Sequence, residues 1–396
     1  MVSDWTLLAR MVADRWGTPV YAFKSSEIDS AVQQLETIES TLPIRHWLSC
    51  KTLAIAPLLK RWHAMNRGIE VVSPFELSAA LTEGFEPDRI LVNGTAKHRW
   101  LQAFDIPRLH VQFDSLHEIR ALAPLAAARQ WQVGIRVHTD ENRDPDNEQF
   151  FDHFGITAAE IPRALDAFKQ HNAEPRCISF HLRSNLRTTA PYLNALAEAA
   201  SICDINGVQP QYLDIGGGLP APGESIAGLD GSFFNLGAMS HVYESAHRLF
   251  PSVRELWLEN GRFVTSRAGI LLLRVWDIKQ RGDMRYLVCD GGRVNHAFPS
   301  DWQSHNITTL PKRDGGKVAT TICGPTCMAY DVLARTDLPR DIEPGDLLIW
   351  HNAGAYHIAW ETRFSFGSAP IVWFEGDNEP QLVRPRESFQ SWWSSL

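Results

Sequence analysis

GIEVVSPFELSAALTEGFEPDRILVNG, residues 68–94, contains a strand-like apolar run, a helical pattern and a second strand-like run. Each run is short and ends at turn residues, while leucine and alanine recur at helical spacing between them. The same unit repeats from about residue 44 onwards. Eight strands are predicted in this way, at 45–50, 68–73, 89–94, 108–115, 133–139, 177–184, 212–218 and 256–262.

Helical patterns lie between these strands, at 52–66, 74–85, 96–104, 116–130, 161–172, 190–206 and 238–250. Eight strand and helix units within about 220 residues are what a (β/α)8 barrel of the TIM type requires. A doubly wound open sheet is the alternative architecture. It would more often contain fewer strands and a Gly-x-Gly-x-x-Gly turn after the first one, and that turn is absent from this sequence.

The last third of the chain has a different pattern. After residue 265, alternating runs separated by turns predict a second, mostly antiparallel β domain. The segment TPVYAF, residues 18–23, is also strand-like and is a candidate to join it. We therefore expect an α/β plus β protein, with the barrel at 24–265 and a β domain at 266–396 that is completed by residues 1–23.

The composition indicates a soluble globular protein, with 44% hydrophobic and 21% charged residues. The net charge of −8 argues against nucleic acid or an anionic membrane as the main partner, so a small molecule is the expected one. No apolar run reaches the eighteen or so residues of a membrane span, and the first residues lack a signal-peptide pattern. A cytoplasmic location and a reducing compartment fit the four isolated cysteines, Cys50, Cys177, Cys203 and Cys289, which form no disulfide framework. Cys323 and Cys327 lack a second pair at zinc spacing, so we expect no metal site.

Reactive residues occur at the carboxyl ends of the predicted strands, where a barrel of this type carries its chemistry. They are Lys51, Glu70, Arg136, His181, Ser184, Gly216, Gly217, Gly218, Glu259 and Arg262. Each one has an ordinary explanation, such as a surface lysine, a tight glycine turn, a core histidine or a local ion pair. Together they suit pyridoxal phosphate, which needs a lysine for its aldehyde, backbone N–H groups for its phosphate and a carboxylate for its ring nitrogen.

These segments resemble the fold-type III pyridoxal-phosphate decarboxylases, which include ornithine, diaminopimelate and carboxynorspermidine decarboxylases and share the alanine-racemase-like fold. WLSCKT at 47–52 is similar to the Tyr-x-x-Lys-x-Asn segment of the family, and SFHLRSN at 179–185 to Phe-His-x-Gly-Ser. LDIGGGLP at 213–220 is similar to the glycine-rich phosphate loop, and ENGR at 259–262 to Glu-Pro-Gly-Arg.

The resemblance implies a role for each matched residue of the barrel. Lys51 would be the Schiff-base lysine, His181 would lie against the cofactor ring, and Glu259 would pair with the ring nitrogen. The residues that would bind the phosphate are Ser184, Gly216, Gly217, Gly218, Gly261 and Arg262. Glu70 and Arg136 are further candidates for cofactor binding.

Two segments of the β domain extend the resemblance. CGPTCMAYD at 323–331 looks like Gly-Pro-x-Cys-(Asp/Glu)-x-x-Asp, and HNAGAYH at 351–357 resembles Glu-Asn-(Ala/Met)-Gly-Ala-Tyr. The resemblance implies that Cys327 and Tyr356 work at the cofactor. It also implies a head-to-tail homodimer in which Cys327 reaches the active site of the neighbouring subunit.

The sequence departs from the family where the substrate would bind. Met328 stands where relatives that act on diamine precursors have an acid that meets the distal amino group. An ammonium buried against a thioether would be unpaired, which disfavours ornithine or lysine as the substrate. Arg183 and Arg187 are candidates to bind a carboxylate of the substrate, with solvated or paired surface arginines as the alternative. Cys327 would also contact the substrate.

We therefore predict a pyridoxal-phosphate-dependent decarboxylase of an amino acid, with catalytic residues Lys51, His181, Glu259 and Cys327. The preferred substrate is a non-standard or carboxylate-bearing amino acid of a specialised pathway, such as siderophore or secondary-metabolite biosynthesis. Diaminopimelate decarboxylase is one alternative. An amino-acid racemase or epimerase is a second, and an inactive regulatory homologue is a third. The carboxylate at 259 and the thiol at 327 favour decarboxylation over racemisation.

Overall fold

The computed structural model describes residues 5–142, 153–223, 233–297, 299, 303, 305–376 and 378–395. The chain divides into two compact units, Gln33–Phe263 and Met1–Val32 together with Val264–Leu396. The expected domain boundaries at residues 24 and 265 remain a prediction. No helix of the described ranges combines the length and the apolar character that crossing a membrane would require.

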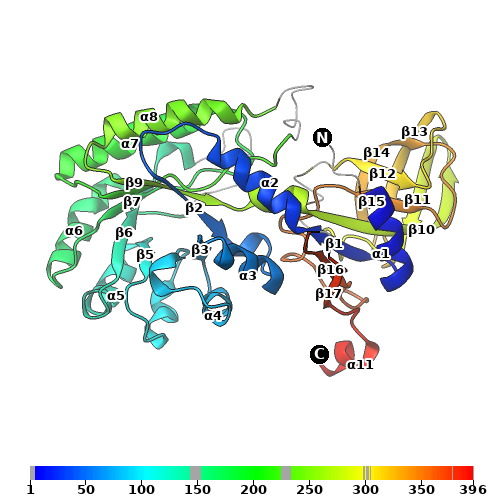
Figure 1. The fold of residues 1–396 in the computed structure, drawn as a ribbon, viewed down its shortest axis with the longest axis horizontal. Coiled ribbons are helices and arrows are strands. Elements are labelled where there is room, and N and C mark those ends of the chain that lie inside the picture. The colour runs from blue at the N-terminus through cyan, green and yellow to red at the C-terminus, as the bar shows by residue number, and fades with distance from the viewer. Residues whose placement is uncertain are drawn as a thin grey trace. The chain divides into compact units, whose positions relative to one another are not determined.

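The first unit contains a closed barrel of eight parallel strands (Figure 1). The strands are β2 (Ile44–Ser49), β3 (Gly68–Val71), β4 (Ile90–Val92), β5 (His110–Phe113), β6 (Gln132–Arg136), β7 (Cys177–Ser179), β8 (Tyr212–Asp214) and β9 (Glu255–Asn260). The barrel closes where β2 pairs in parallel with β9, with Ile44 opposite Leu256. The predicted barrel is therefore confirmed.

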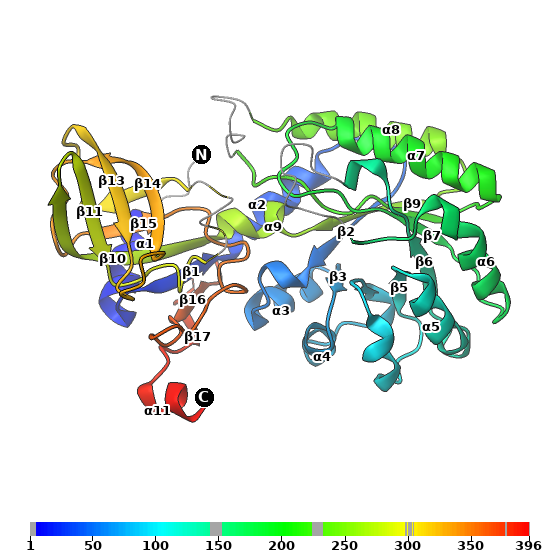
Figure 2. The same cartoon turned by 180° about the vertical axis from the view of Figure 1, so that it is seen from behind.

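Helices surround the barrel strands (Figures 1 and 2). They are α3 (Ala56–Ala64), α4 (Pro74–Thr82), α5 (Leu116–Ala128), α6 (Ile161–Lys169), α7 (Ala190–Asn206) and α8 (Met239–Leu249). The boundary between the two units, after Val32, falls within helix α2 (Ser25–Glu36). Helix α4 begins at residues that are typical of a helix N-terminus. The Ser73 hydroxyl caps the helix by accepting a hydrogen bond from the Glu76 backbone N–H, and Pro74 occupies the first helical position.

The helix predicted at 96–104 is absent. Two short 3-10 turns, Lys97–Arg99 and Leu101–Ala103, replace it. Ala96 has a φ of 55°, in the left-handed region, so an α-helix cannot begin there. The side chain of Lys97 is fully buried and bonds to the Glu118 carboxylate, which holds the chain in this tight turn.

The second unit is built on a largely antiparallel sheet with the strand order β14-β13-β11-β10-β1-β16-β17, and β15 links β10 to β12. Its strands are β1 (Val20–Lys24), β10 (Gly269–Arg281), β11 (Met284–Cys289), β12 (Ile307–Leu310), β13 (Lys317–Cys323), β14 (Val332–Pro339), β15 (Leu347–Trp350), β16 (Ile371–Phe374) and β17 (Gln381–Arg384). Its helices are α1 (Thr6–Trp16), α9 (Arg262–Thr265, which begins just before the unit) and α11 (Phe389–Ser394).

The N-terminal strand β1 lies inside this sheet, between strands from the other end of the chain. It pairs antiparallel with β10, where Val20 faces Leu272, and parallel with β16, where Tyr21 faces Ile371. Helix α1 contributes Ala9, Val12 and Ala13 to the core cluster on this sheet. The strand-like segment at 18–23 thus supplies an interior strand of the β domain.

Candidate functional site

Lys51 lies immediately after strand β2, at the carboxyl end of the barrel, in a single 3-10 turn (Cys50–Thr52). Its Nζ donates hydrogen bonds to both carboxylate oxygens of Glu70, at 3.1 Å each. The parallel register of β2 and β3 sets Ser49 opposite Glu70, which brings the two charges together. Glu70 is buried, whereas the lysine side chain is 36% exposed. The lysine amine therefore has a fixed position and remains accessible.

Glu259 is the centre of a second group, near the end of strand β9. Its Oε2 accepts a hydrogen bond from His181 Nδ1 at 3.0 Å, and its Oε1 accepts one from the side-chain amide of Asn93. The carboxylate is only 6% exposed. Three strands thus bring these polar groups together, because Asn93 follows β4 and His181 lies just beyond β7.

Asn93 is a site residue that the sequence analysis missed. It directly follows β4, within the predicted strand 89–94, so the strand-end criterion covers its position. An asparagine gave no chemical signal by itself, because its importance comes from the carboxylate that it contacts across the barrel.

A buried carboxyl group, Asp214, accompanies Glu259. Its Oδ1 accepts the Gly216 N–H at 2.9 Å, and its Oδ2 has no hydrogen-bond partner among the described residues. Burial and the charge of Glu259 raise the pKa of Asp214 well above its ordinary value. Burial would also raise the pKa of Glu259, but the hydrogen bond and charge of His181, with Lys51 and Arg136, lower it below 4.5. The negative charge of this pair therefore resides on Glu259 at neutral pH.

The triple glycine after β8 packs tightly against this group. Gly216 and Gly218 have φ values of 69° and 112°, which favour glycine. A Cβ at Gly216 would lie 2.7 Å from His181 Nδ1, and one at Gly217 would lie 2.5 Å from the Glu259 carbonyl oxygen. The Tyr192 hydroxyl donates to the Gly217 carbonyl at 2.5 Å. The close contacts and the positive φ angles therefore both require glycine in this loop. Because glycine has no side chain, the backbone of the loop lies close to His181 and Glu259.

Three other predicted barrel residues lie near the ends of their strands. Arg136 ends β6 with its guanidinium 4.4 Å from the Phe154 ring, and its Nε has no hydrogen-bond partner within the described ranges. A Cβ at Gly261 would lie 2.3 Å from the Thr52 side chain, so this glycine allows the segments after β9 and β2 to approach. Arg262 is buried at the start of α9.

The predicted substrate residues of the barrel differ in their surroundings. Arg183 forms an ion pair with Glu141 at 3.6 Å, and both side chains are largely buried. Glu141 also accepts a hydrogen bond from the Asn194 amide at 2.7 Å. Ser184 and Arg187 are exposed. Arg183 is therefore paired with an acid, and the binding of a substrate carboxylate by Arg183 or Arg187 stays a prediction.

In the β domain, Asp331 organises the loop that carries Cys327. Its carboxylate accepts the backbone N–H groups of Arg293 and Thr326, at 2.7 and 3.0 Å, and also the Thr326 hydroxyl. Cys327 is exposed with a φ of 58°, and Met328 is 38% exposed. The aspartate of this motif therefore holds the loop in shape.

Tyr356 follows β15 in a turn, with a φ of 67°, and is partly exposed. It belongs to the same compact unit as Cys327 and Met328. The barrel residues Lys51, Glu70, His181 and Glu259 belong to the other unit. Among the predicted barrel residues, the structure pairs Lys51 with Glu70 and His181 with Glu259, and a site shared by the two units stays a prediction.

A buried ion pair supports the carboxyl end of the barrel near Asn93. Lys97 and Glu118 are at most 1% exposed and meet at 2.9 Å. The Glu118 carboxylate also accepts the backbone N–H groups of Lys97 and Asp114, at 2.7 and 3.0 Å. It therefore joins the turn after β4 to the residue after β5. Nothing local in the sequence indicated this pair.

Comparison with known proteins identifies two matching regions. Residues 28–266 match the pyridoxal binding domain of the pyridoxal-dependent decarboxylases, and residues 262–354 match the C-terminal sheet domain of the same family. The chain is 26% identical over 404 residues to a diaminopimelate decarboxylase of Aquifex aeolicus, covering 96% of this chain and 91% of that protein. It is 28% identical over 403 residues to one of Actinosynnema pretiosum subsp. auranticum, covering 95% and 88%.

Solved structures share the fold at lower identity. Diaminopimelate decarboxylase from Helicobacter pylori complexed with L-lysine matches with a TM-score of 0.83 and 20% identity, over 98% of both chains. Lysine/ornithine decarboxylase from Vibrio vulnificus complexed with cadaverine matches with a TM-score of 0.80 and 19% identity, over 95% of this chain and 98% of that one. The barrel and the sheet domain therefore occur together in both of these proteins.

Proposed function

Since the chain belongs to the pyridoxal-dependent decarboxylase family, we propose that its substrate is diaminopimelate, from which it removes one carboxyl group as carbon dioxide. The protein is a carboxy-lyase with pyridoxal phosphate as its cofactor. The prediction of a specialised-pathway substrate finds no support among the relatives. The alternative that the sequence analysis gave, diaminopimelate, agrees better with them.

The observation that carries the catalytic proposal is the ionised, buried carboxylate of Glu259. When bound, pyridoxal phosphate supplies an electron sink for the carbanion that the departing carbon dioxide leaves. That sink needs a protonated ring nitrogen, and a carboxylate with a depressed pKa keeps such a proton in place. His181 and Asn93 hold both oxygens of this carboxylate. The arrangement supports decarboxylation over racemisation.

The other barrel residues have roles that fit the same cofactor. Lys51 would bind its aldehyde, because its amine is accessible and Glu70 fixes its position. The phosphate would be held by the tight glycine loop 216–218, where a Cβ would collide with neighbouring groups, and by Ser184, Gly261 and Arg262. Arg136 would add a positive charge near these groups.

The ion pair of Arg183 and Glu141 supports a substrate with a charged amino-acid group at its far end. Arg183 follows His181 by two residues in the sequence. The ion pair provides one positive and one negative group, and each side chain is about three-quarters buried. Diaminopimelate carries an ammonium and a carboxylate at the end that does not react. We propose that Arg183 binds this carboxylate and Glu141 this ammonium, which replaces the acid that Met328 lacks.

A substrate panel tests the proposal. Carbon dioxide release and product identity would be measured for diaminopimelate, ornithine, lysine and carboxynorspermidine, with Lys51→Ala as the inactive control. We expect lysine as the product of diaminopimelate, and a kcat/KM for ornithine at least about 100-fold lower, as for a site with an unpaired charge. Comparable turnover of ornithine, or no release from diaminopimelate, would refute the substrate assignment.

The Arg183 and Glu141 contact has its own test. Arg183→Gln and Glu141→Gln should each raise KM for diaminopimelate more than they lower kcat, because they remove binding at the end that does not react. Arg187→Gln is the matched control, an exposed arginine four positions along the chain. An unchanged KM in both variants would contradict this contact.

We also propose a head-to-tail homodimer in which Cys327 and Tyr356 complete the site of the neighbouring subunit. Lys51→Ala and Cys327→Ala would each be inactive, but mixed dimers would contain one site with neither substitution. Mixing and re-association in equal amounts should restore roughly a quarter of the wild-type turnover. No recovery from dimers that demonstrably exchange subunits would mean that each site is built from one chain.

A further inference from the structure

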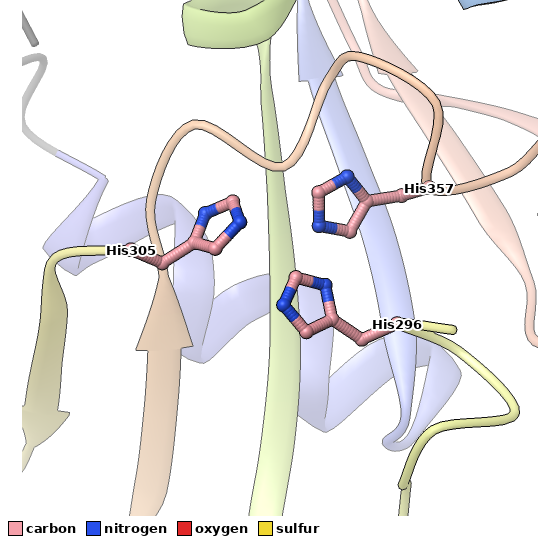
Figure 3. A group of neighbouring side chains, drawn as sticks. All are labelled: His296, His305 and His357. Atoms are coloured by element: carbon pink, nitrogen blue, oxygen red, sulfur yellow. The ribbon is translucent and has the colours of Figure 1, made fainter. Parts of the chain in front are cut away.

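Three histidines from separate parts of the β domain converge on one point (Figure 3). His296 lies in the turn after β11, His305 lies just before β12, and His357 lies in the loop after β15. One ring nitrogen of each lies within 4.8 Å of the others. Their spacing along the sequence matches no zinc-binding pattern.

Backbone hydrogen bonds set the tautomers of two of these rings. His305 Nδ1 lies 2.8 Å from the His351 carbonyl oxygen, and His357 Nδ1 lies 3.0 Å from the Ala355 carbonyl oxygen. A carbonyl oxygen can only accept, so each Nδ1 carries the hydrogen. Each Nε2 consequently presents a lone pair. Metal-binding histidines are commonly oriented in this way, by a hydrogen bond from the second ring nitrogen to a carbonyl group.

The third ring, His296, is completely buried. Neither of its nitrogens has a hydrogen-bond partner among the residues that the structure describes. It stacks on His357 with the ring centroids 4.5 Å apart and packs against Trp350 at 4.9 Å. A buried polar ring without a partner is unfavourable, and an ion that accepts its lone pair would provide one.

Together these contacts point to a metal site, and we propose that His296, His305 and His357 bind one divalent transition-metal ion. Zn²⁺ is the best fit, because imidazole nitrogens suit it and three protein ligands leave a fourth position for water. Tetrahedral bonds of about 2.0–2.1 Å place ligand nitrogens about 3.3 Å apart. Small ring rotations would bring the nitrogens, now within 4.8 Å, to that separation.

The bound ion would join three segments that are distant in sequence. It ties the turn at His296, the start of β12 and the loop 351–360, in which His357 directly follows Tyr356. This role differs from the decarboxylation chemistry and does not depend on it. Metal content and activity can therefore be measured as separate properties.

The test uses the full-length enzyme with bound cofactor, purified without an affinity tag or chelator. Elemental analysis should give about one zinc or other divalent transition metal per chain, and X-ray absorption should give nitrogen neighbours at about 2.0–2.1 Å. His296→Ala and His305→Ala should lose the metal. His241→Ala, an exposed histidine outside the cluster, and Cys327→Ser should keep it. Chelation should lower the Tm of the wild type and leave the Tm of His296→Ala unchanged.

Results of the opposite kind would overturn the proposal. These are sulfur neighbours in the absorption spectrum, metal retained by folded His296→Ala, or no binding by chelator-treated wild type at micromolar Zn²⁺, Co²⁺ or Ni²⁺. If the histidine variants do not fold, the absorption spectrum and the metal titration of the wild type decide the question.

Discussion

Replacement of Glu118 by glutamine should strongly destabilise the barrel. Glu118 accepts three hydrogen bonds, two from Lys97 and one from the Asp114 backbone, and the ion pair is at most 1% exposed. A glutamine would turn its NH2 group toward at least one of these donors and remove the carboxylate charge that pairs with Lys97. Loss of one partner of a buried ion pair costs about 3–5 kcal/mol. For a unit of this size, about 2–4 °C per kcal/mol gives a Tm lower by about 6–20 °C.

Differential scanning calorimetry of the cofactor-bound enzyme would measure this change. Glu86→Gln is the matched control, because Glu86 pairs with Arg89 at 2.9 Å but is 55% exposed. An exposed ion pair contributes about 0–1 kcal/mol to stability, so the Tm of the control should fall by at most about 4 °C. Equal Tm values for Glu118→Gln and Glu86→Gln would refute the reasoning.

The pH dependence of the Tm of the Glu118→Gln variant tests whether Lys97, without the Glu118 charge, causes the loss of stability. Burial lowers the pKa of Lys97, and the charge of Glu118 opposes this shift. Without Glu118, the unfolded chain binds more protons at this lysine than the folded chain does, so stability rises with pH. The Tm deficit of the variant should therefore shrink between about pH 7 and pH 9. If the Tm difference between wild type and variant grew over this range, Lys97 would not be the cause of the destabilisation.

The remaining predictions concern the two groups of site residues. Glu259→Gln should lower kcat by about 100-fold or more. Asp214→Asn should leave kcat nearly unchanged, since the raised pKa of Asp214 favours its uncharged form and asparagine still accepts the Gly216 N–H. Because its folded pKa is depressed, Glu259 stabilises the fold above pH 4.5, and the Tm difference between wild type and Glu259→Gln should narrow below it. Asp331→Asn should reduce turnover and keep the visible absorption of bound cofactor, because the hydrogen bonds that it weakens hold the loop of Cys327 and the turn at Arg293, which lie outside the barrel.

The sequence predicted the barrel because its signals are local. Residues 68–94 form β3, α4 and β4 as the alternation of apolar runs and helical spacing indicated. The search for reactive residues at strand ends likewise selected Lys51, Glu70, His181 and Glu259. In the structure Lys51 pairs with Glu70, and His181 pairs with Glu259. In these cases periodicity alone determines which residues reach the carboxyl end of the barrel.

The misses have a common physical cause. Lys97 lies in a predicted helix, but its burial depends on a carboxylate 21 positions further along the chain. The ion pair of Arg183 with Glu141 was not predicted either, because Glu141 lies 42 positions earlier in the chain. The three histidines of the proposed metal site lie next to β11, β12 and β15, and they meet only because these strands belong to one sheet. Contacts of this kind depend on the complete fold, and no local pattern reveals them.

The position of β1 has a consequence for biosynthesis. This strand is made first, but its partners β10 and β16 begin at Gly269 and Ile371. About 245 residues separate Lys24 from Gly269, so at 5–20 residues per second the strand waits on the order of 10–50 s for its first partner. All eight barrel strands are made in that interval, the last of them ending at Asn260, whereas the β domain is completed only after β16 and β17. During translation, the apolar strand VYAFK is therefore the segment for which a chaperone or a neighbouring nascent chain would compete.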